Sequence, residues 1–133
     1  MKDDFLKGKI ICVDFDSTIS HYDGWKGAGV FGAPIQGVAW ALGKFREMGA
    51  TVIIHTCRRE SQHIADYLFK NGIPYDEINF SPRNAKLKLS DKLAADIYID
   101  DRAINFSGEW HDTYRQVVNF VPWEKKNARA ISS

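Results

Sequence analysis

The stretch KIICVDFDST, residues 9–18, decides the fold, because an apolar run typical of a strand ends there in two aspartates. Side chains two residues apart on a strand point to the same side, so Asp14 and Asp16 emerge together. The carboxyl end of a parallel strand faces the ligand crevice of an open α/β sheet. Two carboxylates this close repel each other unless a cation lies between them or one of them is protonated. The pair is therefore a candidate site for a metal ion and a phosphate group.

Apolar runs and helical patterns alternate along the rest of the chain. The further runs with strand character are Ala50–His55, Ile97–Ile99 and, less clearly, Tyr75–Phe80. The segments with helical character are Gln36–Met48, Ser61–Lys70 and Glu109–Phe120. Strands that alternate with helices of this length are typical of βαβ units. We expect a single three-layer α/β domain that is Rossmann-like and has a mainly parallel central sheet.

Size and composition indicate one globular domain. The chain of 133 residues is 44% hydrophobic and 26% charged, which is ordinary for such a domain. We expect the domain to span residues 1–124 and residues 125–133 to form a loosely held tail, because the tail lacks a periodic apolar face. The net charge of +1 gives no electrostatic reason to expect a nucleic-acid partner.

The sequence carries no pattern typical of a membrane span or of export. No apolar run approaches the ~20 residues that cross a bilayer. The first residues, Met1–Asp4, open without the apolar region of a signal peptide. Cys12 lies in the first expected strand and Cys57 follows the second, and neither has metal-ligand spacing. Reduced cysteines suit the cytoplasm, so we expect a cytoplasmic protein without a membrane partner.

Residues 20–34 differ in composition from the rest of the chain. They hold four glycines together with the large aromatic residues Trp25 and Phe31. We interpret them as a hairpin-like loop that projects directly after the acidic pair. One hypothesis is a flexible connector whose aromatic rings fold back on the core. The other is a flap that covers the site, with Trp25 or Phe31 touching substrate, and the position beside the acidic strand end favours it.

The strand ends carry Asp14 and Asp16, then Thr56, and then Asp100 and Asp101, and Lys92 lies just before the last strand. This ordered set resembles the haloacid dehalogenase-like (HAD) phosphohydrolase superfamily. Its first motif, a strand ending in Asp-x-Asp-x-Thr, is matched by DFDST at residues 14–18. Its second, a strand ending in Thr or Ser, is matched by IIHT at residues 53–56. Its third and fourth, a lysine upstream of an apolar strand that ends in paired acids, are matched by Lys92 and DIYIDD at residues 96–101. The four motifs follow the family order.

The resemblance implies a Mg²⁺-dependent phosphatase and a role for each matching residue. Asp14 would be the nucleophile that forms an aspartyl-phosphate, and Asp16 the general acid and base. Thr56 would hydrogen-bond a phosphoryl oxygen, and Lys92 would neutralise phosphate charge. The implied metal ligands are Asp14, the backbone carbonyl of Asp16, Asp100 and Asp101. Such a cation offsets the repulsion between a phosphate dianion and a carboxylate nucleophile, and Mg²⁺ accepts a few carboxylates together with waters and phosphate oxygens.

Each of these roles has an alternative. Asp14 and Asp16 could hold a metal without nucleophilic chemistry. Thr56 could cap the helix that begins near Glu60, which is a common use of threonine. Arg58 is a candidate contact for a substrate anion, although an arginine after a strand is commonly a solvated surface residue.

The assignment of the lysine and of the last acidic pair also has rivals. Lys86 and Lys88 compete with Lys92, because Leu93 stands where the family often has proline after its lysine. Of the two late acids, Asp100 is favoured as the direct metal ligand. Asp101 would be either a second ligand or an acceptor behind the first.

The gaps between the motifs are too short to hold a cap domain, so the chain resembles a capless member of the superfamily. An open site admits a nucleotide, a sugar phosphate or the phosphorylated end of a macromolecule. A neighbouring subunit of a homo-oligomer could cover the site for small substrates. Two other classes compete: a phosphate-binding module without turnover and a receiver-like phosphoacceptor domain. Receivers carry the phosphorylated aspartate mid-chain, where this sequence has His55-Thr56. Phosphotransfer to an acceptor other than water is not separated from hydrolysis by these motifs.

Overall fold

The computed structural model of the chain describes residues 5–88 and 91–125. The chain divides into two compact units, Met1–Ile99 and Asp100–Ser133, which we describe separately. The expected domain limit at residue 124 and the expected tail of residues 125–133 both fall in the second unit. Residues 126–133 lie outside the described part of the chain.

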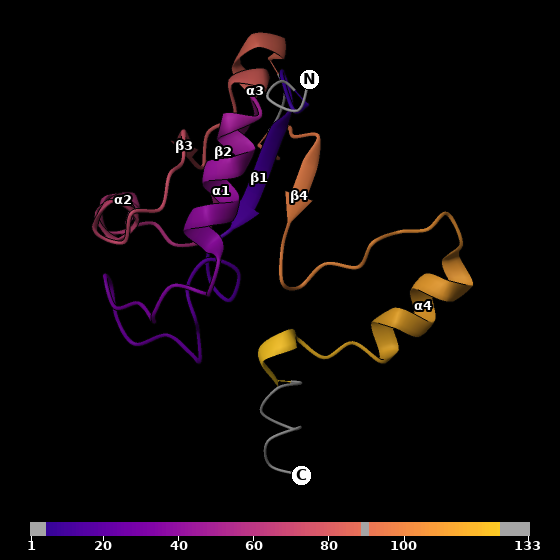
Figure 1. Cartoon of the computed structure of the whole chain (residues 1–133). Coiled ribbons are helices and arrows are strands. Elements are labelled where there is room, and N and C mark those ends of the chain that lie inside the picture. Colours follow the sequence, from indigo (N-terminus) through magenta and orange to yellow (C-terminus); the bar gives the residue numbers. More distant parts are fainter. Residues whose placement is uncertain (1–4, 89–90, 126–133) are drawn as a thin grey trace. The chain divides into compact units, whose positions relative to one another are not determined.

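The first unit is built on a four-stranded parallel sheet (Figure 1). Its strands are β1 (Ile10–Asp14), β2 (Thr51–His55), β3 (Glu77–Ile78) and β4 (Ile97–Ile99), in the order β3-β2-β1-β4. All three pairings are parallel. Asp14 pairs with His55 and Val13 with Ile99, so the carboxyl ends of β2, β1 and β4 lie at one edge. The predicted α/β class and parallel sheet are confirmed, and the sheet is Rossmann-like.

The helices lie close to the predicted segments. They are α1 (Val38–Glu47), α2 (Ser61–Lys70), α3 (Pro82–Leu87) and, in the second unit, α4 (Trp110–Val118). The helix α3 was not expected from the sequence. It begins at Pro82, whose fixed φ suits the first turn and whose missing N–H has no helical partner there. Its six residues carry too few apolar positions to show a helical period.

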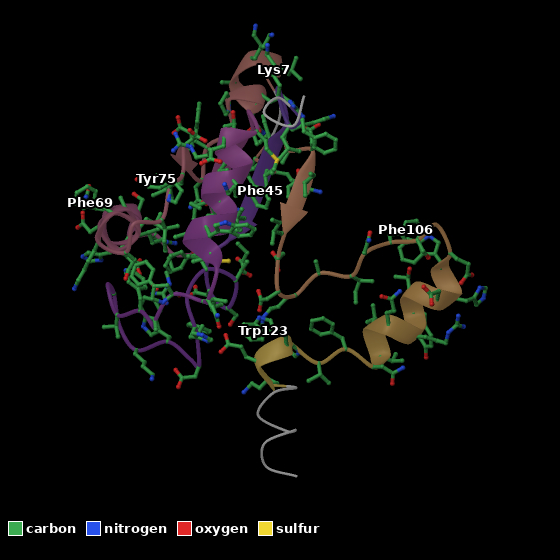
Figure 2. The ribbon with its side chains drawn as sticks, in the orientation of Figure 1. Lys7, Phe45, Phe69, Tyr75, Phe106 and Trp123 are labelled. Atoms are coloured by element: carbon green, nitrogen blue, oxygen red, sulfur yellow. The ribbon has the colours of Figure 1, made fainter. Side chains whose placement is uncertain are left out.

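The core is divided between the two faces of the sheet. On one face, Ile11, Val13 and Ile54 pack with Leu42 of α1 and Leu68 of α2. Figure 2 shows the chain with its side chains, including Phe45 of α1, which packs against this cluster, and Phe69 of α2, which is 89% exposed. The two helices therefore cover this face with their apolar sides.

The other face of the sheet carries a smaller cluster. Ile10, Cys12 and Ile53 are buried there, and they contact partly buried Leu93 and Ala95 from the segment before β4. Two layers are thus defined within the first unit. The expected third layer stays a prediction.

The carboxylate of Asp96 fixes the start of β4 against β1. It accepts the backbone N–H of Ile10 at 2.8 Å and is held by both terminal nitrogens of Arg83, at 3.3 and 2.9 Å. The Asp96 N–H in turn donates to the Ile10 carbonyl at 2.8 Å. The hydrogen bond from Arg83 and that from the Ile10 N–H lower the pKa of Asp96 to about 2. Asp96 is therefore a structural residue of the sheet.

We expect this carboxylate to make folding stability depend on acid pH. The folded pKa of about 2 lies below the ordinary value of 3.8, so the stabilisation is complete above pH 4 and is lost as the pH falls toward 2. The melting temperature of the wild type should exceed that of Asp96→Asn at pH 7, and the gap should shrink between pH 4 and pH 2. The control is Asp91→Asn, a change at an exposed loop residue. A gap that does not change with pH would contradict the assignment.

The second unit contains α4 with a well-formed amino-terminal cap. The Glu109 carboxylate accepts the backbone N–H of His111 at 3.0 Å and also that of Asp112 at 2.5 Å. These bonds lower the pKa of Glu109 below its ordinary value. The predicted helix over Glu109–Phe120 is thereby confirmed, with Glu109 as its cap.

Two further expectations concern cysteines and membranes. Neither Cys12, which is buried, nor Cys57, which is exposed, is in a disulfide. Within residues 5–88 and 91–125, no helix combines the length and the apolar character that a bilayer span requires.

Candidate active site

The turn that follows β1 is tightly folded. The Phe15 carbonyl accepts the N–H groups of Ile19 at 2.8 Å and Ser20 at 3.2 Å. Ser17 adopts a left-handed conformation with φ 64°, which disfavours a non-glycine residue by about 1 kcal/mol or more. The Thr18 hydroxyl donates to Asp14 Oδ2 at 3.3 Å. This strained turn presents the carboxylates on either side of the buried Phe15.

Asp16 is held by Arg58 from the segment after β2. Arg58 Nε donates to both carboxylate oxygens of Asp16, at 3.1 and 3.0 Å, and Nη2 donates to Oδ1 at 2.9 Å. The Arg58 side chain is only 5% exposed, and that of Asp16 is 27% exposed. Charge-assisted bonds through the guanidinium fork fix both the position and the orientation of a carboxylate. Arg58 is therefore a buried residue of the site and not a solvated surface arginine.

Glu60 lies on the other side of the same guanidinium. Arg58 Nη1 and Glu60 Oε1 are 3.6 Å apart, and in the part of the chain that the structure describes both atoms are buried without a hydrogen bond. Burial lowers the pKa of Arg58. The hydrogen bond and charge of Asp16, together with the charge of Glu60, raise it by more, so the pKa of Arg58 lies above its ordinary value. The guanidinium is thus charged and enclosed by two acids. The sequence signal for Glu60 was weak, because it is one acid in a loop.

Thr56 follows β2 and is held by Asn79, which follows β3. Asn79 Oδ1 accepts the Thr56 N–H at 2.9 Å, and Asn79 Nδ2 donates to the Thr56 carbonyl at 3.1 Å. The Thr56 hydroxyl accepts the N–H of Arg58 at 3.0 Å, so it stabilises the turn of residues 56–58. It does not cap α2, whose N-cap residue is Glu60. Asn79 was not predicted. It has a left-handed φ of 52°, a conformation that asparagine tolerates, and nothing in the expected strand Tyr75–Phe80 indicated it.

The loop of residues 20–34 closes on itself as a hairpin, as expected. Ser20 bridges to Pro34, and the His21 N–H donates to the Ala33 carbonyl at 2.9 Å. Gly32 is required here, since a Cβ atom would lie 2.2 Å from the His21 carbonyl oxygen. We call residues 20–34 the flap. In Figure 1 it leaves the carboxyl end of β1 and returns to α1.

The base of the flap is anchored to the core by aromatic rings. Phe31 makes edge-on contacts with Phe15 and Tyr67, with ring centroids 5.3 and 5.1 Å apart. Phe15 and Tyr67 also meet at 5.5 Å. The Tyr67 hydroxyl donates to the Gly32 carbonyl at 2.8 Å, and burial raises the pKa of Tyr67 to about 12. The flap is therefore attached to α2 and to the turn after β1.

Aromatic rings of the flap also lie close to Arg58. The guanidinium carbon is 5.8 Å from the ring centroid of Tyr22, 5.0 Å from that of Trp25 and 4.7 Å from that of Phe31. These distances are within the range of cation–π attraction. A cavity of about 170 Å³ lies within the flap, with His21, Lys26 and Arg58 in its wall. The structure thus brings Trp25 to Arg58, as a neighbour of the guanidinium.

Asp100 and Asp101 open the second unit. Asp100 directly follows Ile99, the last residue of β4. Asp100 Oδ1 accepts the Arg102 N–H at 2.8 Å, and Asp101 Oδ2 lies 3.6 Å from Arg102 Nε. Both acids are therefore held in a short turn after the strand, where the fourth motif of the resemblance predicts them.

The structure places Lys92 before the amino end of β4, whereas Asp16 and Thr56 follow the carboxyl ends of β1 and β2. Its ammonium lies 5.2 Å from the ring centroid of Tyr98, and its carbonyl accepts Asn84 Nδ2 at 2.8 Å. Among the described residues, Arg58 forms an ion pair with Asp16, whereas the contacts of Lys92 are with Tyr98 and Asn84. The catalytic role of Lys92 stays a prediction.

Comparisons with known proteins bear on the fold. No known protein family matches the sequence, and no curated protein is similar to it. A solved structure of a conserved protein from Bacteroides thetaiotaomicron is similar, with a TM-score of 0.60 and 22% identity. The match covers 87% of this chain and 94% of that one. The likeness is one of fold.

Proposed function

We propose that this protein is a Mg²⁺-dependent phosphomonoester hydrolase of the HAD-like type, without a cap domain, that acts through an aspartyl-phosphate. The observation that carries the proposal is the meeting of two carboxylates and a threonine hydroxyl at one edge of a parallel sheet. Asp14 and Asp16 end or follow β1, and Thr56 follows the neighbouring β2. Ligands of open α/β sheets bind at this edge.

The donor groups in this part of the chain fit a magnesium ion. Asp14 is the last residue of β1, and Asp100 and Asp101 directly follow β4. Val13 of β1 pairs with Ile99 of β4, and the next residue in each case is an aspartate, Asp14 or Asp100. We therefore assign Asp14 and Asp100 to the same ion. The backbone carbonyl of Asp16 and the Asp101 carboxylate would complete the protein ligands. Mg²⁺ prefers such oxygen donors, and when bound it neutralises charge on the phosphoryl group.

The side chains then divide the reaction between them. A carboxylate oxygen of Asp14 attacks phosphorus, and the ester P–O bond breaks as Asp16 gives its proton to the leaving oxygen. In the second half, Asp16 takes a proton from a water molecule that attacks the same phosphorus, and the bond to Asp14 breaks to release phosphate. The Thr56 hydroxyl hydrogen-bonds a phosphoryl oxygen. Its backbone is fixed for this task by Asn79 at both its N–H and its carbonyl.

The test is a phosphatase screen with the full chain, over nucleotides, sugar phosphates, phosphopeptides and 3′-phosphorylated oligonucleotides. We expect release of inorganic phosphate that stops with a chelator and returns with Mg²⁺. Asp100→Asn should raise the Mg²⁺ concentration needed for half-maximal rate about tenfold or more, because a charged ligand is lost. Asp91→Asn, at an exposed loop position, is the matched control and should leave it unchanged.

The outcomes separate the proposed activity from its rivals. Phosphate binding without release of product would favour a binding module. Transfer of phosphate to an added alcohol rather than to water would favour a phosphotransferase. A rate that is independent of divalent cation would contradict the proposed metal site. Size-exclusion chromatography of the active protein would show whether a second subunit is available to cover the site.

A further inference from the structure

We propose that Arg58 is a positioning residue, which pins the flap to Asp16, rather than a residue that binds the substrate phosphate. The proposal deepens the function proposed above and rests on it for its kinetic part. Its structural part concerns the link from Asp16 through the Arg58 guanidinium to the flap, and this part stands without any turnover.

One edge of the guanidinium is occupied by a protein carboxylate. Nε and Nη2 donate three hydrogen bonds of 2.9–3.1 Å to Asp16. Nη1 faces Glu60 Oε1 at 3.6 Å without a hydrogen bond. The side chain is 5% exposed, so little of it is open to a ligand from solvent. A guanidinium donates in its plane, and Arg58 would have to leave Asp16 in order to bind a phosphate dianion through its Nε–Nη2 edge.

The faces of the guanidinium are covered by the flap. The rings of Tyr22, Trp25 and Phe31 lie 4.7–5.8 Å from its central carbon. Phe31 also contacts Phe15, the residue between the two aspartates, whereas Tyr22 and Trp25 lie in the first half of the loop. Trp25 is 60% exposed, and its ring centroid lies 5.0 Å from the guanidinium carbon. One buried cation thus joins the acid to the part of the flap above it.

The position of the flap and the orientation of Asp16 therefore depend on each other. Cation–π contacts of a desolvated guanidinium and its charge-assisted hydrogen bonds are both stabilising. Loss of either set should loosen the flap, and loss of the acid should loosen it through the same arginine. The flap carries a built-in reporter in Lys26, because trypsin cleaves after lysine and cleavage follows the open population of a segment.

The first experiment is a double-mutant cycle on the rate of tryptic cleavage after Lys26, read by mass spectrometry. Arg58→Lys keeps the charge but loses the fork, and it should speed cleavage about tenfold. Asp16→Asn should have a similar effect, and the double variant should exceed neither single variant by more than about twofold, because both changes break one contact. Independent effects that multiply to about a hundredfold would overturn the proposal, as would two unchanged rates. Arg59→Gln, at the exposed neighbouring arginine, is the control and should cleave at the wild-type rate.

A second variant keeps the test decisive if Arg58→Lys does not fold. Trp25→Leu removes an exposed ring that lies 5.0 Å from the guanidinium carbon, and it is not a change in the core. It should also speed cleavage after Lys26 several-fold. Circular dichroism and a thermal melt check that each variant is folded. If Arg58→Lys does not fold, Trp25→Leu and Asp16→Asn form the cycle, and wild-type cleavage in Trp25→Leu contradicts the proposal.

The kinetic arm separates positioning from substrate binding. In Arg58→Lys we expect kcat to fall about a hundredfold, the range of general acid–base effects, while KM changes less than about threefold. A rise in KM at unchanged kcat would show that the guanidinium binds the substrate anion, and the proposal would be wrong. If the wild type hydrolyses no phosphomonoester, the proposed function fails, whereas the cleavage cycle still decides whether Arg58 pins the flap.

Discussion

The Asp14→Asn variant is expected to lose turnover almost completely, by at least about 10⁴-fold in kcat, because it lacks the proposed nucleophile. Asparagine has nearly the same volume, and its amide oxygen can still accept the Thr18 hydroxyl that lies 3.3 Å from Asp14. The fold should therefore survive. The measurement is release of inorganic phosphate from the best substrate of the screen, together with a thermal melt of both proteins.

A trapping experiment makes this expectation specific to the covalent step. Wild-type protein quenched in acid during turnover should carry a phosphoryl group on the peptide that contains Asp14, and Asp14→Asn should carry none. Asp66→Asn is the matched control, since Asp66 is an exposed acid on α2 that accepts a bond from Gln62. Full activity in Asp14→Asn, or a phosphoryl group on a different residue, would exclude the proposed nucleophile.

The largest expected effect on stability comes from Phe15→Ala. Phe15 is fully buried and contacts the rings of Phe31 and Tyr67, so its removal leaves a cavity where the flap joins the core. Substitutions of this kind lower the free energy of unfolding by about 3–5 kcal/mol. Urea unfolding followed by circular dichroism measures the change. Because Phe31 loses its partner, the same variant should also cleave faster after Lys26.

The control for this prediction is another phenylalanine of the same unit. Phe69 is 89% exposed on α2 (Figure 2), and Phe69→Ala should change the free energy of unfolding by less than about 0.5 kcal/mol. A loss below about 1 kcal/mol in Phe15→Ala would mean that its ring does not hold the flap base.

Elements with a repeated local pattern could be predicted from the sequence. The strand Ile10–Asp14 and the helix Ser61–Lys70 are set by apolar residues at periods that local geometry dictates, and both were found where expected. The short β3 and α3 were weak or missing in the prediction, because two and six residues hold too little pattern. They are fixed by pairing with β2 and by the proline at the start of α3.

The candidate site was predictable in its residue types but not in its contacts. Asp14, Asp16 and Thr56 stand at strand ends, and strand ends follow from the apolar runs before them. The partnership of Arg58 with Asp16 joins residues 42 positions apart, and that of Asn79 with Thr56 joins residues 23 apart. Such contacts depend on how the turns after neighbouring strands fold against each other. A local pattern cannot encode them.

The two ends of the flap are paired, and this has a consequence for how such proteins can diversify. Ser20 and Pro34 are bridged, and the Ile35 N–H donates to the Ile19 carbonyl at 2.8 Å, so the two chains that enter and leave the segment are adjacent. Lengthening the tip between Gly24 and Gly29 would leave these adjacent chain segments, and the strand that carries the proposed nucleophile, where they are. Natural variation or engineering at the tip could therefore change which molecules reach the site without changing the proposed reaction.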